Sequence, residues 1–396
     1  MTTTSTTTPA PVLDTAYFRR WLAETDRLVR RDSARLTELD AVIGDGDHGA
    51  NLVRGFGAVG AAVAEARPET PGELLTLAGS TLTNTVGGAS GPLFGTALRR
   101  TGKVLGATAV PTGAELADAL GAGLKSVQKL GGAEVGDATL VDALAPGIAA
   151  LSDAAGAGRP LREALDEACR AARAGADGTA ALQARKGRAS YLGERSVGHQ
   201  DAGANSVALL MEALRTAVDA TEVPAGAEPG PVAESVAEAV AQPVAEAVAA
   251  SDPGTEPARG TRTGRVGVVL VSHSAKVAAS VAELSGALLG SVDPAPLAVA
   301  GGTPDGGIGT SADLILAAAR EVDEGHGVAV LCDMGSAVLT LKSLLAESPS
   351  PLPADTRIVD APFLEGAMAI TLTAAIGGDL DSVLAAAEDA RQYRKR

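Results

Sequence analysis

Hydrophobic residues recur every three or four positions along the first 220 residues of the chain. This spacing gives each segment one apolar stripe, which is typical of helices that pack against one another. No stretch in this region shows the strict alternation of apolar and polar residues that indicates a half-buried strand. We therefore predict eight helices, at 16–31, 51–66, 72–82, 92–105, 114–130, 140–151, 161–175 and 205–220.

The connections between these predicted helices are of two alternating kinds. Short plain connections lie near 67–72, 105–113 and 154–160, and the others are glycine-rich and carry charged or hydroxyl side chains. Alternate connections of an up-and-down helical array lie at the same end of the array. We expect four loops to converge on one rim: GDGDHG (44–49), VGGASG (86–91), GGAEVGDAT (131–139) and RKGRASYLGERSVGHQDAG (185–203).

After a change of composition the chain repeats strand, glycine-bearing loop and helix. Valine-rich runs at 265–272, 296–302, 327–335 and 356–362 alternate with helical patterns at 276–289, 312–322, 337–347 and from about Glu365. Such a sequence favours an α/β doubly wound parallel sheet that helices cover on both faces. The working residues of such sheets lie beyond the carboxyl ends of the strands. Those positions hold His273, the GGTPDGGIGT loop, Asp333 and the turn from Pro362 to Glu365.

The segment between the two patterns is rich in Ala, Pro, Glu and Gly. It cannot bury enough apolar surface to offset its ordering entropy, so we interpret residues 221–263 as a linker with at most two turns of marginal helix. A flexible chain of roughly 40 residues spans on the order of 35 Å. We expect a disordered tail at 1–13, a helical domain at 14–220 and an α/β domain at 264–396.

Composition limits the classes of function. The net charge of −15 disfavours a surface that neutralises nucleic-acid phosphates or anionic lipid, so we expect no nucleic-acid and no membrane partner. The only cysteines, Cys169 and Cys332, form no disulfide framework and fit a reducing compartment. The start lacks the regions of a signal peptide, and no stretch of about 18 apolar residues occurs. We therefore expect a cytoplasmic protein.

Three aspartates, Asp40, Asp45 and Asp47, crowd into the stretch LDAVIGDGDHGAN. GDGDHG matches the dinucleotide fingerprint G-x-G-x-x-G, but the segment before it is charged and helical where that fingerprint needs an apolar strand. An EF-hand loop fails because Phe56 stands where the bidentate glutamate belongs. Three carboxylates need a counter-charge, and Mg²⁺ supplies one while leaving sites for phosphate oxygens. The loop therefore favours an aspartate, magnesium and phosphate cluster.

Each candidate also has a plainer interpretation. Asp40 can cap a helix while the other aspartates solvate a turn, and His48 can be a structural histidine. VGGASGP can be a tight turn, or a phosphate cradle built from backbone N–H groups and the Ser90 hydroxyl. The basic side chains of the last loop can be solvated or can bind phosphates or a partner: Arg185, Lys186, Arg188 and Arg195.

The stretches LDAVIGDGDHGAN, VGGASGPLFGT, GDATLVDAL and QARKGRASYLGERSVGHQDAGA resemble the ADP-binding L subunits (DhaL) of phosphotransferase-dependent dihydroxyacetone kinases. The resemblance implies an all-α, eight-helix up-and-down barrel that holds ADP or ATP and two Mg²⁺ at one rim, with Asp40, Asp45 and Asp47 as metal ligands. Ala202 stands where this family commonly has proline. The residues implied to line the nucleotide are His48, Gly49, Ala50, Asn51, Ala89, Ser90, Gly131, Leu140, Arg188, Asp201, Ala202 and Gly203.

His273 follows the first predicted strand between two serines and precedes a helix. Imidazole can carry a phosphoryl group, and a helix N-terminus can stabilise its charge, although a loop histidine with satisfied hydrogen bonds is the plainer interpretation. With GGTPDGGIGTS, LCDMGSA and APFLEGA, residues 265–375 resemble the IIA domain of mannose-type phosphotransferase systems, as used by DhaM subunits. The resemblance implies that His273 is phosphorylated and makes Asp333 a candidate for orienting it.

Together the resemblances imply a phosphoryl relay. HPr, itself phosphorylated by enzyme I, would phosphorylate His273, which would phosphorylate ADP, and the ATP formed would phosphorylate dihydroxyacetone on a separate DhaK subunit. A homodimer through the IIA-like domain is compatible with the sequence. Two alternatives stay open: a nucleotide-binding regulator that senses phosphorylation state, and an ATP-consuming glycerone kinase domain with exchangeable nucleotide.

Overall fold

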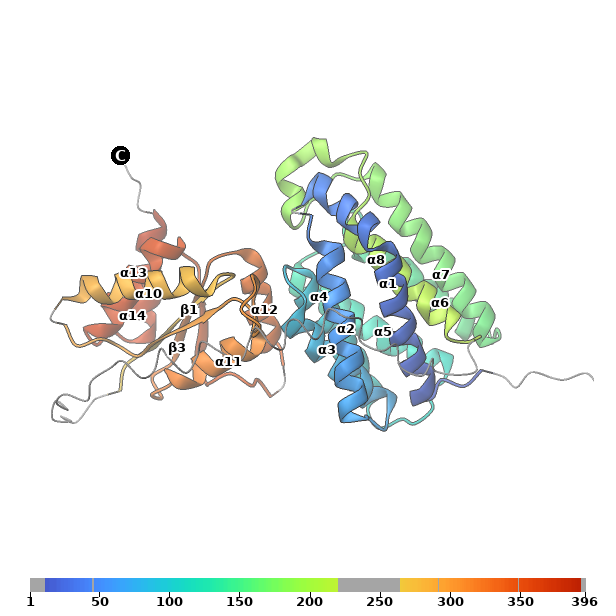
Figure 1. Cartoon of the computed structure of the whole chain (residues 1–396), viewed down its shortest axis with the longest axis horizontal. Helices are drawn as coiled ribbons and strands as arrows, with labels where there is room; N and C mark the ends of the chain where they lie inside the picture. Colours follow the sequence, from blue (N-terminus) through green and yellow to red (C-terminus); the bar gives the residue numbers. More distant parts are fainter. Residues whose placement is uncertain (1–10, 45, 220–263, 291, 348, 393–396) are drawn as a thin grey trace, which may run out of the picture.

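The computed structural model describes residues 11–44, 46–219, 264–290, 292–347 and 349–392. It contains a helical part, residues 11–219, and an α/β part, residues 264–392, which lie side by side in Figure 1. Most of the predicted tail, the whole of the predicted linker 221–263 and the metal-ligand candidate Asp45 lie outside the described residues.

Eight α-helices make up most of the helical part, as the apolar spacing predicts. Each packs against the next along the chain, and the last packs against the first, so the helices close into a barrel. Tyr17 Oη donates to the carbonyl of Leu214 at 2.5 Å, and Trp21 Nε1 donates to that of Leu210 at 2.9 Å, which ties the ring shut. The helices are α1 (Thr15–Ile43), α2 (His48–Ala66), α3 (Pro71–Thr85), α4 (Ser90–Leu105), α5 (Gly113–Gly131), α6 (Val141–Gly156), α7 (Leu161–Gly178) and α8 (Ala202–Thr216).

The first helix extends beyond the apolar pattern at 16–31 into the following charged segment, whose helical character the sequence also indicates. It continues through the charged segment DSARLTELDAVI to Ile43, so only residues 44–47 separate it from α2. The connection between α7 and α8 contains two 3₁₀ segments, Thr179–Ala181 before the basic loop and Arg188–Ser196 within it.

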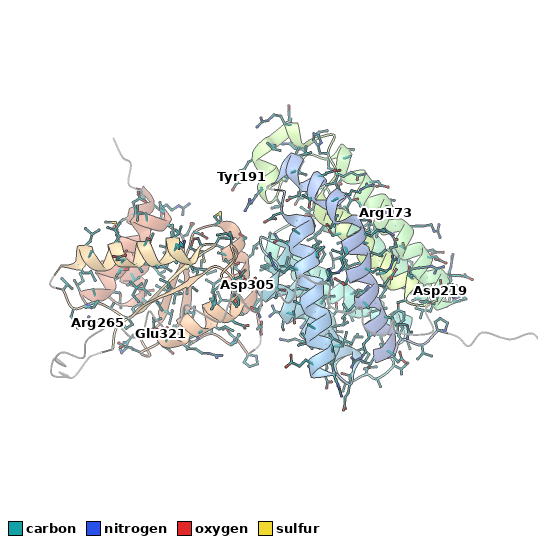
Figure 2. All side chains as sticks on the ribbon, viewed as in Figure 1. Arg173, Tyr191, Asp219, Arg265, Asp305 and Glu321 are labelled. Atoms are coloured by element: carbon teal, nitrogen blue, oxygen red, sulfur yellow. The ribbon has the colours of Figure 1, made fainter. Side chains whose placement is uncertain are left out.

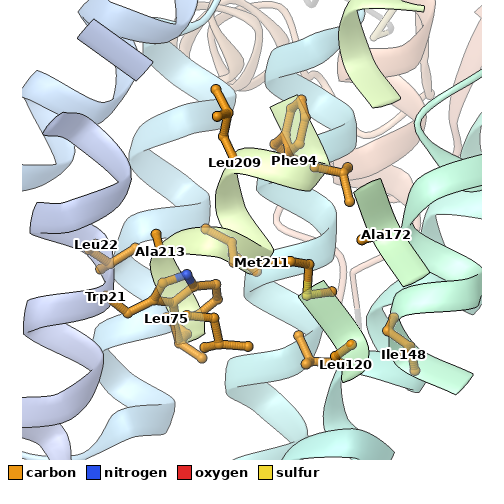
Figure 3. Packing of buried hydrophobic residues seen from close by; sticks show 14 of the residues in the cluster. Trp21, Leu22, Leu75, Phe94, Leu120, Ile148, Ala172, Leu209, Met211 and Ala213 are labelled. Carbon is orange, nitrogen blue, oxygen red and sulfur yellow. The ribbon is translucent and has the colours of Figure 1, made fainter. Parts of the chain in front are cut away.

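Aliphatic side chains and glycines fill the barrel. Leucine, valine and alanine from all eight helices surround Trp21, Phe94 and Met211, and Figure 3 shows part of this cluster. Helices α3 and α4 approach closely at a glycine pair: a Cβ built on Gly79 would lie 2.5 Å from the carbonyl oxygen of Gly95, and one on Gly95 would lie 2.6 Å from that of Gly79. The barrel can be closely packed with few aromatic residues, because the helix backbones themselves make these contacts and leave little space for large side chains to fill.

The α/β part has a four-stranded parallel sheet in the order β2-β1-β3-β4, with β1 (Gly267–Ser272), β2 (Leu297–Gly301), β3 (Val328–Cys332) and β4 (Thr356–Val359). Both central strands, β1 and β3, are fully buried, which explains their unbroken apolar runs. The order of the strands reverses between β1 and β3, where open sheets of this class form their sites.

Helices cover both faces of this sheet, as predicted. Helices α11 (Ala312–Glu321) and α12 (Gly335–Leu345) pack on one face, and α10 (Ala275–Leu289), α13 (Phe363–Ala375) and α14 (Leu380–Gln392) pack on the other. The predicted single final helix is two helices, because Gly377 has a φ of +87° and ends the first of them. None of the helices described combines the length and apolar character needed to cross a bilayer.

Candidate functional site

Four helix N-termini meet at one rim of the barrel. Helices α2, α4, α6 and α8 begin at His48, Ser90, Val141 and Ala202, directly after the four glycine-rich loops. A helix N-terminus presents free N–H groups and a positive dipole end. The rim is therefore suited to anionic groups such as phosphates.

His48 joins three of these helix ends. Its Nε2 lies 2.7 Å from Ser206 Oγ of α8, and its Nδ1 lies 3.1 Å from Ser90 Oγ at the start of α4. Ser206 donates its proton to the carbonyl of Ala202 at 3.0 Å, so it must accept from Nε2. This chain of bonds assigns the proton of a neutral imidazole to Nε2 and makes Ser90 the donor to Nδ1. The buried His48 side chain thus holds the starts of α2, α4 and α8 in fixed positions relative to one another.

Backbone contacts bring the other loops to the same place. A Cβ built on Gly87 would lie 3.1 Å from the Asn51 side chain, and one on Gly203 would lie 3.4 Å from Leu140 Cβ. The N–H of Arg185 donates to the carbonyl of Asp137 at 3.0 Å, which links the third and fourth loops. All four glycine-rich loops therefore converge, as the alternation predicts.

The acidic side of the rim is organised by Asp40, in the last turn of α1. Its Oδ2 accepts from the N–H groups of Asp47 at 3.0 Å and His48 at 3.3 Å, so Asp40 caps the start of α2. Asp47 occupies the N-cap position of α2. Among the described residues, which omit Asp45, no group of three His, Cys, Asp or Glu side chains is gathered as in a metal site.

Two further carboxylates lie beside this loop. Asp142, which the sequence did not single out, is buried and accepts from the N–H groups of Gly136 at 2.6 Å and Thr139 at 2.8 Å. The pKa of Asp201, the N-cap of α8, is raised to about 7, chiefly by burial and also by the charges of Asp142 and Asp40, while the hydrogen bond from the Ala204 N–H opposes the rise. Crowded carboxylate oxygens with an excess of negative charge are the donor set that Mg²⁺ prefers.

The remaining predicted nucleotide residues lie around the same loops. Gly49 and Ala50 belong to the first turn of α2, Ala89 is the N-cap of α4, and Gly131 ends α5. Arg188 begins a 3₁₀ segment of the basic loop and is exposed. Ala202 opens α8 after the cap formed by Asp201, whose carboxylate accepts from the Ala204 N–H at 2.6 Å, so the helix starts normally without the family's proline.

In the α/β part, His273 and Asp333 follow the adjacent strands β1 and β3. Nδ1 of His273 lies 2.9 Å from Asp333 Oδ1, while Asp333 Oδ2 accepts from the His273 N–H at 2.8 Å and from the Ser272 hydroxyl at 2.9 Å. Burial opposes ionisation of Asp333, but these hydrogen bonds outweigh it and hold the pKa of Asp333 below its usual value. An ionised Asp333 fixes the proton on Nδ1 and leaves the lone pair on Nε2.

Sequence reasoning missed the residue on the other side of the ring. Ser336 Oγ lies 2.6 Å from Nε2 of His273, in the first turn of α12. A phosphoryl group on Nε2 would therefore meet a hydroxyl and a helix N-terminus. The sequence does contain a signal for Ser336, because this residue belongs to the LCDMGSA segment in which a strand passes directly into a helix. Ser206, by contrast, lies inside a helix and has no sequence signature.

Comparisons with known proteins agree with this division. Residues 42–216 match the DAK2 domain, and residues 267–384 match the PTS system fructose IIA component. The helical half is 41% identical over 197 residues to "PEP-dependent dihydroxyacetone kinase, ADP-binding subunit DhaL" of Escherichia coli (strain K12), covering 50% of this chain and 94% of that protein.

Some longer relatives match this chain over only about a third of their own length. L-erythrulose 1-kinase of Mycolicibacterium smegmatis is 43% identical over 187 residues, which is 46% of this chain but 32% of that protein. The dihydroxyacetone kinase of C. freundii, solved in complex with AMP-PNP and Mg²⁺, is 25% identical with a TM-score of 0.41, covering 55% of this chain and 36% of that chain. The extensive match to whole DhaL subunits shows that this chain belongs to the DhaL family and carries, in the same polypeptide, a IIA component of the kind found in the phosphotransferase system.

Proposed function

We propose that the chain relays a phosphoryl group from a phosphorylated carrier protein through His273 to ADP held at the barrel rim, as a component of a phosphoenolpyruvate-dependent dihydroxyacetone kinase. One observation carries this proposal: a histidine whose Nε2 faces the Ser336 hydroxyl while Asp333 holds its Nδ1, and a rim of helix N-termini suited to anions, occur in the same chain. The first is suited to carry a phosphoryl group and the second to bind a nucleotide.

The histidine step follows from its two neighbours. Nε2 of His273 attacks the phosphorus of the donor, the bond from the donor's nitrogen to phosphorus breaks, and the electron pair stays with the donor. Nδ1 keeps its proton throughout, and the positive charge that develops on the ring is stabilised by Asp333. Ser336 donates its hydroxyl to the incoming phosphoryl oxygens.

At the rim the nucleotide is the acceptor of the phosphoryl group and hence a substrate. Its phosphates would meet the helix N-termini at Ser90 and Asn51, with Arg188 nearby on the basic loop. Asp40, Asp45 and Asp47 would hold Mg²⁺, in two ions, whose charge would offset that of the carboxylates and the diphosphate. Catalysis here is positioning and charge neutralisation.

No part of this sequence resembles a subunit that binds dihydroxyacetone, so we look for that function in a partner. Its relatives include kinases of dihydroxyacetone and of L-erythrulose at similar identity, so the helical part does not select the acceptor. We propose that a separate DhaK subunit binds dihydroxyacetone and that HPr, with enzyme I upstream, supplies the phosphoryl group. Two free cysteines are consistent with work in the cytoplasm.

A homodimer through the α/β part is supported by one surface. Four exposed apolar residues follow one another at intervals of four along α13, which places them on one stripe: Leu364, Met368, Leu372 and Ile376. A symmetric contact between two copies would bury this stripe. Light scattering of Leu372→Glu should then give a monomer where the unchanged chain gives a dimer.

Reconstitution tests the relay. The chain is mixed with enzyme I, HPr, phosphoenolpyruvate, Mg²⁺, ADP and DhaK, and dihydroxyacetone phosphate is measured. The His273→Ala variant should form no product from phosphoenolpyruvate. It should form product when ATP replaces phosphoenolpyruvate, because the rim is intact. Product formation by His273→Ala from phosphoenolpyruvate would refute the relay.

A further inference from the structure

The two parts of the chain touch each other at a defined surface. Helix α12 lies against α4 and α5, and α11 lies against α3 (Figure 1). Within the described part of the chain, polar contacts cross this boundary: Arg99 of α4 forms an ion pair with Glu347, just after α12, and the N–H of Asp313 in α11 donates to Asn84 Oδ1 at 3.1 Å. Arg99 is 11% exposed and Glu347 24%, so the pair lies within the contact.

The contact lies at the edge of the sheet that holds His273. The loop from Thr303 to Gly309 is attached to the histidine, because the N–H of Gly309 donates to the His273 carbonyl at 2.9 Å. The same glycine abuts the rim: a Cβ built on Gly309 would lie 3.9 Å from Cα of Gly87. Gly87 in turn packs against Asn51. The backbone of His273 is thus connected to Asn51, a predicted nucleotide-lining residue, through Gly309 of one loop and Gly87 of the other.

Charge complementarity strengthens this placement. Asp305 lies in the same loop, and Figure 2 shows it at the boundary between the parts. Hydrogen bonds from Thr303 and Gly307 lower the pKa of Asp305, and the charge of Arg54 in α2 lowers it further. Arg54 also donates to Asn51 Oδ1 at 2.7 Å and to the Thr85 carbonyl at 2.8 Å. The charge of Arg54, which is held at the rim, is therefore opposite in sign to that of the loop beside His273 and close enough to favour its ionised form.

The boundary is suited to repeated association and release. A cleft of about 1060 Å³ remains between α12 and helices α4, α5 and α6. Its basic lining side chains are Arg99, Arg100, Lys103, Lys125, Lys129 and Lys342. A contact that is incompletely filled and carries many charged side chains resembles a transient interface more than a permanent one. A carrier domain needs this property, because it must also leave the rim to be phosphorylated again.

We propose that this surface, defined by the pairs Arg99–Glu347 and Asn84–Asp313 and by the approach of Gly309 to Gly87, is a docking site on the barrel for the chain's own α/β part, from which phospho-His273 delivers its phosphoryl group in cis. The inference rests on the proposed function. In the docked step the bond from Nε2 to phosphorus breaks, an oxygen of the β-phosphate of ADP forms the new bond, and the electron pair returns to Nε2. Nδ1 keeps its proton, so the step is balanced.

The first experiment measures transfer. The full chain is phosphorylated at His273 with labelled phosphoenolpyruvate, enzyme I and HPr, then mixed with Mg²⁺ and ADP in a single turnover. The rate constant should not depend on protein concentration. Glu347→Arg should lower it about 3- to 10-fold, because a partly buried attraction becomes a repulsion. The double variant Glu347→Arg with Arg99→Glu should recover a rate constant within about 2-fold of that of the unchanged chain.

The matched control is Glu388→Arg, an exposed charge reversal on α14 at the far face of the sheet, which should leave the rate unchanged. Phosphorylation of His273 by HPr should be equal in all variants. An unchanged rate in Glu347→Arg would overturn the docking proposal, and so would a faster rate, which would make the contact inhibitory.

A second experiment is independent of activity. Asn84→Cys combined with Asp313→Cys should be joined by a short bismaleimide within one chain at all dilutions, whereas Asn84→Cys with Glu388→Cys should not. Burial raises the pKa of Cys332 to about 12 and also raises that of Cys169, so the native thiols react little. Absence of the cross-link would overturn docking. A cross-link without transfer to ADP would instead contradict the proposed function.

Discussion

Ser336 Oγ and Nε2 of His273 are 2.6 Å apart, while Asp333 holds the opposite nitrogen of the same ring at 2.9 Å. The imidazole is therefore oriented from both sides before any phosphoryl group arrives. This arrangement separates two roles that mutation can test: Asp333 stabilises the charge on the ring, and Ser336 contacts the group that the ring carries.

Replacing Ser336 with alanine should slow phosphorylation of His273 by HPr roughly 10- to 100-fold, the effect of losing one hydrogen bond to a charged group. Rapid-quench measurement with labelled phosphoenolpyruvate follows this rate. Ser336→Thr, which keeps the hydroxyl, should recover most of it. A rate in Ser336→Ala equal to that of the unchanged chain would show that the hydroxyl does not act on the transferred phosphoryl group.

Asp333 makes the stability of the α/β part depend on pH. Its pKa in the folded chain lies below its ordinary value of 3.8, so it contributes full stability above that value and loses it as pH falls toward the lower folded value. The protection factors of the β1 and β3 amides, which compare observed with intrinsic hydrogen-exchange rates at each pH, should therefore fall below about pH 4. Asp333→Asn should exchange faster at neutral pH and lack this additional acid dependence. Identical pH profiles for the two proteins would contradict the assignment.

How far the sequence predicts this molecule depends on the range of the interactions involved. Helix and strand positions follow from local apolar spacing, and the convergence of four loops follows from their alternation. Ser206 and Asp142 could not be found in this way, because their importance arises from contacts between helices that only the closed barrel brings together. Asp40 is an intermediate case: the sequence leaves a metal ligand and a helix cap both open, and the contact from the last turn of α1 to the start of α2 shows the cap, while the ligand role stays a prediction.

Asp40→Asn should separate these two roles. Asparagine keeps an oxygen that accepts from the N–H groups of Asp47 and His48, so the unfolding free energy without nucleotide should change by no more than about 1 kcal/mol. The lost charge should weaken Mg²⁺-dependent ADP binding by at least about 100-fold. Calorimetry on nucleotide-stripped protein measures this, with the exposed Asp153→Asn at the opposite end of the barrel as control. Unchanged affinity would leave Asp40 as a cap alone.

The close approach of α3 and α4 gives a prediction about stability. In Gly95→Ala the new Cβ would lie 2.1 Å from Thr83 Oγ1 and 2.6 Å from the Gly79 carbonyl oxygen, so the helices must separate at a cost of about 1–3 kcal/mol. Gly60→Ala in α2 meets nothing within 4 Å and should stabilise the barrel by about 0.5–1 kcal/mol through helix propensity. Urea unfolding followed by fluorescence measures both, because the single tryptophan, Trp21, lies in the barrel core and reports on the helical part alone. Equal stabilities for the two alanine variants would mean that glycine at position 95 is not required by the helix contact.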